Sequence, residues 1–392
     1  MQDNWLDFLA GEGAAMQGNS VHHFNDAVLQ DEAAATDWLT ALTDYAVIEV
    51  GSADGGVANS TGAKSTAPRG ASRLMTLPVQ KLSATDFLQN QFCNDLDELN
   101  QTAGVSRGQI NGYCNPKGRL LALFHLIRYL PQSTDSGAAA FRMVLPASVA
   151  ESFVKRLSMF VLGADAKINL QPSLQVLAAA GSKAVAPLDS IMGSGASVAD
   201  LAPYEVITGE SVQVLRLPAD RWLLLSDAQR VEDDWKTLAA SLQVVGNHRW
   251  SLACIAQGEP SVHAETVEKF IPQMLNLQSI DALSFKKGCF PGQEIVARMQ
   301  YLGKLKRNMR RISFNSESLP AIGSAISSGE DADAGTLVSV ACSEAGRYEG
   351  LAVLKADVDV TTLAFDAVAA GPDSATSELK LPYPVELPGC EA

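Results

Sequence analysis

The chain has 392 residues, of which 47% are hydrophobic and 19% charged, so it can form two or three packed domains and disorder is excluded as its default state. Its net charge of −14 argues against a surface that binds nucleic acid everywhere. No apolar run reaches the ~18 residues of a membrane span, and the first basic side chain is Lys64, so we expect neither a membrane segment nor a secretory signal. Six scattered cysteines without a C-x-x-C pair favour free thiols in a reducing cytoplasm and argue against a metal site.

The first part of the chain divides into an arm, a strand and a loop. Residues 1–37 are acidic and alanine-rich, and they predict either a mobile arm or a short helix around Trp5 to Leu9. The apolar run 45–50 predicts the first strand of the folded region. Residues 51–72 are mostly Gly, Ala, Ser and Thr, which cannot bury enough apolar surface to offset their ordering entropy. We expect this stretch to be a loop insertion.

A helix is predicted to begin after Ser83, which can cap its N-terminus with Asp86 three residues further on. Leu88, Phe92 and Leu96 then recur every fourth residue. This spacing predicts one apolar helix face that packs on the core.

Residues 108–130 predict a β-hairpin, because the turn Asn-Pro-Lys-Gly at 115–118 carries Pro and Gly where a type I turn prefers them. Strands and helices then alternate irregularly, which predicts α+β layers. The expected strands are 141–145 and 222–225, and the expected helices are 147–157 and 231–242. Short runs at 311–314, 335–340 and 351–354, separated by Gly and Ser, predict a small C-terminal β barrel. We therefore expect the arm 1–37, an α+β region 38–310 of two subdomains, and the barrel 311–392.

The segment around Cys289 carries the most chemical information. Gly288 and Gly292 flank this cysteine, and glycines let a ligand or another backbone approach closely. The apolar spacing of residues 293–302 predicts a helix, and Gly303 is suited to end it. The free N–H groups at the start of that helix favour anions.

Positive charge is concentrated in the same segment. Between residues 284 and 311 the net charge is +7, which leaves −21 for the rest of the chain. The basic residues are Lys286, Lys287, Arg298, Lys304, Lys306, Arg307, Arg310 and Arg311. Such an island indicates an anionic partner, and the alternative is a solvated helix end followed by a basic linker.

Four short motifs together resemble the YgfZ family of folate-binding proteins linked to tRNA modification. Residues 286–294 (KKGCFPGQE) are similar to the family signature K-G-C-[FY]-x-G-Q-E, and this is the most specific match. Residues 272–277 (PQMLNL), 114–119 (CNPKGR) and 217–222 (LPADRW) resemble further family elements. The resemblance runs from about residue 38 to the end. It implies an aminomethyltransferase-like α+β fold, as in the T protein of glycine cleavage, with a central folate channel and a small C-terminal β barrel.

The resemblance also implies a cofactor site for tetrahydrofolate or a derivative. Two aromatic residues flank the folate in the family, and by local match these are Tyr45 and Trp250. Aromatic faces can stack on the flat pterin ring, and the alternative for both residues is a place in the core. The glutamate tail of the folate is expected to point towards cationic and polar side chains, namely Lys286, Lys287, Gln293 and Arg298.

By this resemblance the protein is a cytoplasmic accessory factor that supports tRNA modification and the maintenance of iron–sulfur enzymes, its expected clients. Cys289 is the candidate functional thiol, because Lys286, Lys287 and a nearby helix N-terminus favour thiolate. The alternative for Cys289 is a small residue in a tight glycine turn. Cys93 and Cys254 lie in apolar segments and are expected in the core. His125, His248 and His263 have no recognisable partners in a catalytic triad.

Two other functions stay open at this point. The T protein uses an acidic residue in a stretch that corresponds to 115–123 here, and apolar side chains stand where its carboxylates would be, so a binding protein is favoured over an enzyme. The alternative is a folate-dependent aminomethyltransferase or other one-carbon transferase. A third hypothesis is a scaffold that makes a weak contact with RNA or protein through the basic stretch 304–311.

Overall fold

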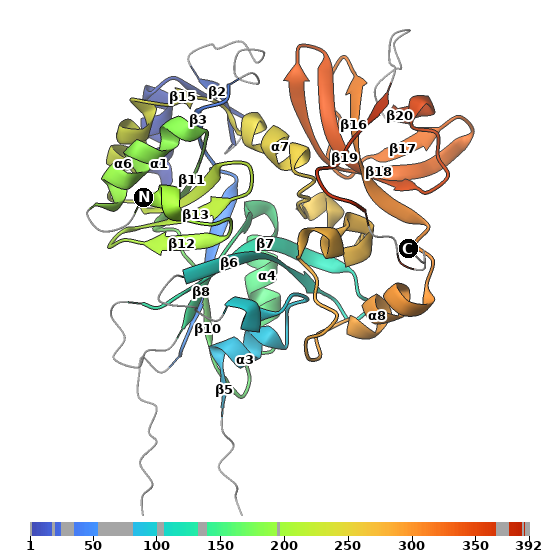
Figure 1. The fold of residues 1–392 in the computed structure, drawn as a ribbon, viewed down its shortest axis with the longest axis horizontal. Helices are drawn as coiled ribbons and strands as arrows, with labels where there is room; N and C mark the ends of the chain where they lie inside the picture. The colour runs from blue at the N-terminus through green and yellow to red at the C-terminus, as the bar shows by residue number, and fades with distance from the viewer. Residues whose placement is uncertain are drawn as a thin grey trace, which may run out of the picture.

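A computed structural model describes residues 2–17, 20–24, 35–53, 81–99, 106–131, 139–193, 197–365, 376–385 and 388. Most of the expected insertion 51–72 lies outside the described residues. Two sheets dominate the fold, and helix α7 lies between the main sheet and the C-terminal sheet (Figure 1).

The main sheet has eleven strands, and its hydrogen-bonded neighbours are antiparallel except for the last pair, β3 and β15. In spatial order the strands are β10 (Lys167–Leu170), β4 (Tyr45–Gly51), β8 (Ala140–Pro146), β7 (Leu120–Tyr129), β6 (Ser106–Cys114), β12 (Glu205–Thr208), β13 (Val212–Leu217), β14 (Arg221–Asp227), β11 (Leu174–Ala180), β3 (Trp38–Ala41) and β15 (Gln243–Val244). The predicted hairpin is β6 and β7, and Gly118 N donates to Asn115 O (2.9 Å) across its turn.

Seven α-helices lie in the described part of the chain: α1 (Gln2–Gly11), α3 (Ala84–Gln89), α4 (Ala147–Ser158), α5 (Val185–Met192), α6 (Val231–Ala239), α7 (Asn247–Ala256) and α8 (Gln293–Leu302). Two small sheets add β1 (Ala14–Gln17) with β2 (Ser20–Phe24), and β5 (Leu82–Ser83) with β9 (Ala164–Asp165). The helix expected around Trp5 is α1, whose Trp5 packs edge-on against Trp235 of α6, with ring centroids 5.8 Å apart. Trp5 and Leu9 are buried, so α1 belongs to the core of the main sheet.

The C-terminal sheet has six antiparallel strands and stands where the sequence predicts a small barrel. Its strands are β16 (Arg307–Asn315), β17 (Ala325–Ser328), β18 (Asp331–Glu344), β19 (Arg347–Lys355), β20 (Leu363–Phe365) and β21 (Ser377–Leu379). Phe314 and Phe365 stack in its core with centroids 4.1 Å apart. The three runs expected as strands lie within β16, β18 and β19.

One expectation about local structure is wrong. Ser83 does cap α3, since its hydroxyl accepts from Asp86 N, but α3 ends at Gln89. Phe92 instead bridges to Tyr113 of β6, and Leu96 begins a separate 3-10 turn. Leu88, Phe92 and Leu96 are all buried, so their spacing predicted burial correctly. The prediction that one helix runs through all three residues is wrong.

Among the described residues, no helix combines the length and the apolar character that crossing a bilayer requires.

Candidate ligand-binding cavity

A cavity of about 120 Å³ lies where the main sheet, α7 and the C-terminal sheet meet. Its polar lining residues are Asp44, Tyr45, His125, Asn247, Trp250, Ser251, Cys254, Glu259, Ser261, His263 and Ser339. Its apolar lining residues are Ile110, Leu123, Phe124, Val144, Pro146, Pro260, Ile322 and Val340. Residues far apart in the sequence therefore form one site through tertiary packing.

The walls of the cavity follow from the periodicity of the elements that form them. Ile110, His125 and Val144 are register partners on β6, β7 and β8, so their side chains share one face of the sheet. On α7 the lining residues are Asn247, Trp250, Ser251 and Cys254, which recur at helical spacing and form one face of the helix. Ser339 and Val340 of β18 close the third side.

Tyr45 and Trp250, the two predicted aromatic residues, meet in this cavity. The indole Nε1 of Trp250 donates to the Tyr45 hydroxyl (3.4 Å), so the two rings touch at their polar edges. Trp250 is only 2% exposed, and the guanidinium of Arg221 lies 5.3 Å from its ring centroid. Because protein already covers part of the indole, Tyr45 offers the more accessible ring for stacking.

Asp44 is a cavity residue that the sequence analysis missed. It precedes Tyr45 in the turn before β4, and Asn247 Nδ2 donates to its Oδ1 (2.8 Å). Burial raises the pKa of the Asp44 carboxyl to about 6. The one available signal was its position next to Tyr45, and an acidic residue in a turn ordinarily indicates solvent exposure.

A buried charge network forms another part of the cavity wall. Glu259 accepts from Arg221 Nη2 (2.9 Å) and pairs with His125 Nε2 (2.8 Å). Burial alone would raise the pKa of Glu259, but the Arg221 guanidinium and His125 outweigh it and lower the pKa to about 2. The cavity therefore contains carboxylates after all, although they come from other segments than 115–123.

His125 and His263 have side-chain partners in the described part of the chain, since Ser261 Oγ and His263 Nε2 lie 2.8 Å apart and His125 pairs with Glu259. Neither pair joins a serine, a histidine and an aspartate, but the expectation for Cys254 is corrected. Burial lowers the pKa of His263. Cys254 lines the cavity instead of being sealed in the core, and burial raises the pKa of its thiol, which favours the neutral form.

The structure separates Lys287 from the cavity. Its Nζ donates to three backbone carbonyls, those of Gln89 (2.7 Å), Phe92 (2.6 Å) and Asn94 (2.9 Å). Burial lowers the pKa of Lys287 to about 8. An ammonium has three donors, all of which these carbonyls occupy, so the expectation that Lys287 holds a folate tail is corrected to a structural role.

The other residues of the signature segment lie on or before α8 and do not line the described cavity. Lys286, Cys289 and Arg298 are exposed, and Gln293 is half-buried. The structure therefore brings Tyr45 and Trp250 together in the cavity lining, whereas these four residues lie outside that lining. Cys289 is accessible to solvent, and a Cβ on the preceding Gly288 would meet no atom within 4 Å.

The signature segment packs directly on the hairpin turn of β6 and β7. Gly292 has a φ of +83°, and a Cβ there would lie 2.5 Å from Asn115 O and 2.5 Å from Gly118 Cα. Gly118 in turn faces Ile295 of α8. Two motifs that the sequence analysis treated separately thus form one contact, and glycine is required on both sides of it.

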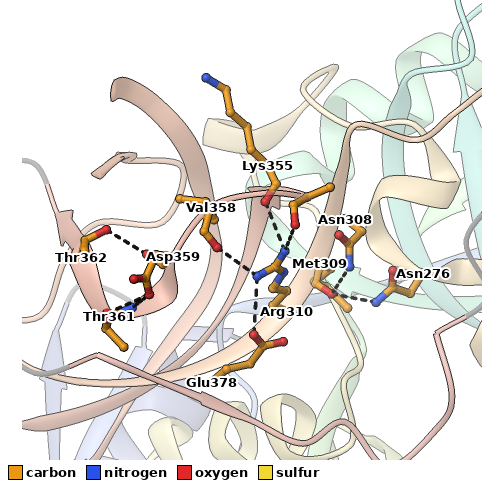
Figure 2. A network of polar contacts seen from close by, with 11 residues as sticks. Asn276, Asn308, Met309, Arg310, Lys355, Val358, Asp359, Thr361, Thr362 and Glu378 are labelled. Carbon is orange, nitrogen blue, oxygen red and sulfur yellow. Dashed lines mark hydrogen bonds and ion pairs between the residues drawn. The ribbon is translucent and has the colours of Figure 1, made fainter. Parts of the chain in front are cut away.

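The basic stretch 304–311 is largely neutralised inside the C-terminal sheet. Arg307 pairs with Asp333 (2.7 Å), and Arg311 pairs with Glu349 (2.7 Å). Figure 2 shows the guanidinium of Arg310 between Glu378 and the carbonyls of its neighbours, including Lys355 and Val358. Only Lys304 and Lys306 of this described stretch stay exposed without an ion pair, which weakens the expectation of an RNA contact here.

The chain matches no protein-family model. It is 32% identical over 222 residues to the tRNA-modifying protein YgfZ of Colwellia psychrerythraea, a match that spans 56% of this chain and 63% of the relative. It is 31% identical over 280 residues to the tRNA-modifying protein YgfZ of Aliivibrio fischeri, spanning 70% of this chain and 81% of the relative.

The fold is similar to the crystal structure of the glycine cleavage system aminomethyltransferase T from Bartonella henselae. The TM-score is 0.66 and the alignment covers 97% of both chains, at 14% sequence identity. This likeness concerns the fold alone, and it confirms the predicted aminomethyltransferase-like α+β class.

Proposed function

The chain belongs to the YgfZ family of tRNA-modifying proteins, and we propose that it binds tetrahydrofolate, or a derivative of it, in the cavity between β7, α7 and β18. The observation that supports this proposal is the meeting of Tyr45 and Trp250 in a cavity with polar walls. A pterin is a flat ring with polar edges, and such a site offers both an aromatic surface and hydrogen-bond partners.

The glutamate tail leaves the cavity and lies against exposed basic and polar residues. Lys286 and Arg298 have exposed side chains, Arg298 lies on α8, and Gln293 stands at the start of that helix. Lys287 is left out of this proposal because its donors are occupied. Arg298→Gln should weaken the binding of a folate with a polyglutamate tail more than the binding of a monoglutamate. Equal weakening of both ligands would show that Arg298 does not contact the tail.

The biological role that we propose is support of tRNA modification through the upkeep of iron–sulfur enzymes in the cytoplasm. Exposed Cys289 is the functional thiol in this role, because a partner or an oxidant can reach it. In cells that lack the protein, Cys289→Ala should restore less tRNA thiolation than the unaltered chain does. Cys342→Ala, which removes a thiol from the C-terminal sheet, is the matched control, and equal restoration by both variants would reduce Cys289 to a packing residue.

Calorimetric titration of the full chain with tetrahydrofolate tests the binding proposal. Tyr45→Ala should weaken binding about three- to tenfold, the range expected for loss of one aromatic stacking contact. Tyr301→Ala, which removes an exposed tyrosine from α8, should bind as the unaltered chain does. The proposal would be refuted if the unaltered chain bound no tetrahydrofolate even at ligand concentrations that saturate a site of moderate affinity.

A second candidate function is a folate-dependent one-carbon transferase of the aminomethyltransferase kind. The observation in its favour is that Asp44 and Glu259 place two carboxylates in the cavity, where one could orient an amine or manage its proton. Tetrahydrofolate and candidate aminomethyl donors should then yield methylene-tetrahydrofolate with release of ammonia. Turnover that disappears in Asp44→Asn would support this function over a purely binding role.

A further inference from the structure

Asp44 is fixed in place before any ligand enters the cavity. Its backbone carbonyl accepts from Ala147 N (2.8 Å) at the start of α4, and its carboxylate accepts from Asn247 Nδ2 (2.8 Å) at the start of α7. Thr40 Oγ1 donates to the Asn247 side-chain oxygen (3.3 Å) and so orients that amide. A group held from several elements in this way is pre-organised, which lowers the entropic cost of binding.

The two cavity carboxylates differ in what they can still accept. Glu259 already receives Arg221 and His125 on its two oxygens. A carboxylate offers about four acceptor sites, so Asp44 retains room for donors from a ligand beside Asn247. Among the described residues, Asp44 is thus the cavity carboxylate with the greater accepting capacity left for a ligand.

Two coplanar acceptor oxygens fit a ligand that presents two parallel N–H donors, as in the paired recognition of a carboxylate by a guanidinium. The 2-amino-4-oxo pyrimidine ring of a pterin has such an edge, formed by N3–H and the 2-amino group. His125 has a buried Nδ1 without a partner in the described structure, but one ring nitrogen cannot accept two parallel donors.

We propose that Asp44 recognises the pterin, with its two oxygens accepting the N3–H and the 2-amino N–H of the ring. This inference rests on the proposed folate binding and adds the specificity-determining residue and the edge of the ligand that it recognises. The other titratable groups around the cavity are Tyr45, His125, Cys254, Glu259 and His263. Burial raises the pKa of Asp44 to about 6, so the carboxylate is mainly ionised at pH 7.5 and can accept both bonds.

The experiment compares tetrahydrofolate with an analogue in which a methyl group replaces the 2-amino group, both titrated calorimetrically at pH 7.5. The unaltered chain should prefer tetrahydrofolate by about 10- to 100-fold, as expected for a hydrogen bond to a charged group. Asp44→Asn has nearly the same shape, and it should lose most of this preference. Tyr45→Ala is the matched control, because it should weaken both ligands while it keeps the preference.

The outcomes separate this inference from the binding proposal. If Asp44→Asn binds tetrahydrofolate as tightly as the unaltered chain while Tyr45→Ala binds it less tightly, folate binding stands and the role of Asp44 is refuted. If the unaltered chain binds both ligands equally, the 2-amino edge is not recognised and the inference fails. If it binds neither ligand, the inference and the binding proposal both fail.

Discussion

The backbones of Gly292 and Gly118 are in direct contact, so that a Cβ on Gly292 would lie 2.5 Å from the Cα of Gly118 and 2.6 Å from its nitrogen. Both glycines also have positive φ angles, +83° and +69°. The contact joins the segment before α8 to the hairpin turn of β6 and β7. A Cβ on Gly292 would force two backbone segments apart, whereas a Cβ on Gly118 would crowd the Ile295 side chain (3.1 Å) and Gly292 O (3.3 Å).

Gly292→Ala should therefore lower the free energy of unfolding by more than about 2 kcal/mol, because strain at positive φ adds to overpacking against backbone. Gly288→Ala is the matched control in the same loop, since a Cβ there meets open space. That control should change stability by less than about 0.5 kcal/mol. Urea denaturation of both variants checks the prediction, and equal stabilities would show that the contact does not need glycine.

Substitution of Lys287 should affect stability strongly, and substitution of its neighbour Lys286 should affect it little. Lys287→Met removes the ammonium that donates to the carbonyls of Gln89, Phe92 and Asn94, and of these Asn94 O keeps a second donor, Asn111 Nδ2 (3.3 Å). The loss should reduce stability by at least about 2 kcal/mol. Lys286→Met changes an exposed side chain and should have little effect on stability. Thermal unfolding of the two variants makes the comparison, and a Lys287→Met protein as stable as the unaltered chain would contradict the structural role of this lysine.

Glu259 should stabilise the fold above about pH 4.5. Its folded pKa lies near 2, below its ordinary value of 4.5, so the stabilisation is lost as the pH falls through the folded pKa. Glu259→Gln leaves Arg221 buried without its partner charge and should cost about 3–5 kcal/mol at pH 7. Urea denaturation at several values between pH 7 and pH 3 should show this difference shrinking in acid, and Glu294→Gln, at an exposed position, is the control for removal of one charge. A constant difference would contradict the pairing.

Asp44→Asn should stabilise the protein at neutral pH. The folded pKa of Asp44, about 6, is raised above its ordinary value of 3.8, so stability falls as the pH rises between these values. Removing the charge should recover up to about 3 kcal/mol at pH 7.5 and almost nothing near pH 4. Asp357→Asn, at an exposed position, is the control for charge removal alone. If Asp44→Asn is less stable than the unaltered chain at pH 7.5, burial of the ionised carboxylate does not cost stability in the ligand-free protein.

Local elements could be predicted from the sequence because their causes are local. The spacing of apolar residues in 293–302 and the Asn-Pro-Lys-Gly turn at 115–118 need only near neighbours, and the structure has α8 and the β6–β7 turn there. Leu88, Phe92 and Leu96 show the limit of this reasoning. Their spacing is the same whether they lie on one helix or are buried separately, and only the bridge from Phe92 to β6 decides it.

The cavity could be predicted only in part, through the family match at Tyr45 and Trp250. Asp44 and Glu259 were missed because nothing in their local sequence distinguishes a buried acid from a solvated one. Lys287 was misassigned for a related reason, since a lysine that bonds to carbonyls 193 to 198 residues earlier has the same local sequence as a free one. Long-range packing decides all three cases.

A crystal structure of the protein with tetrahydrofolate would show where the pterin lies. We expect the pterin in the cavity beside Tyr45, with its 2-amino edge on the Asp44 carboxylate and its tail leading out towards α8. A pterin bound anywhere else, or a cavity that stays closed in crystals soaked with saturating ligand, would contradict this expectation.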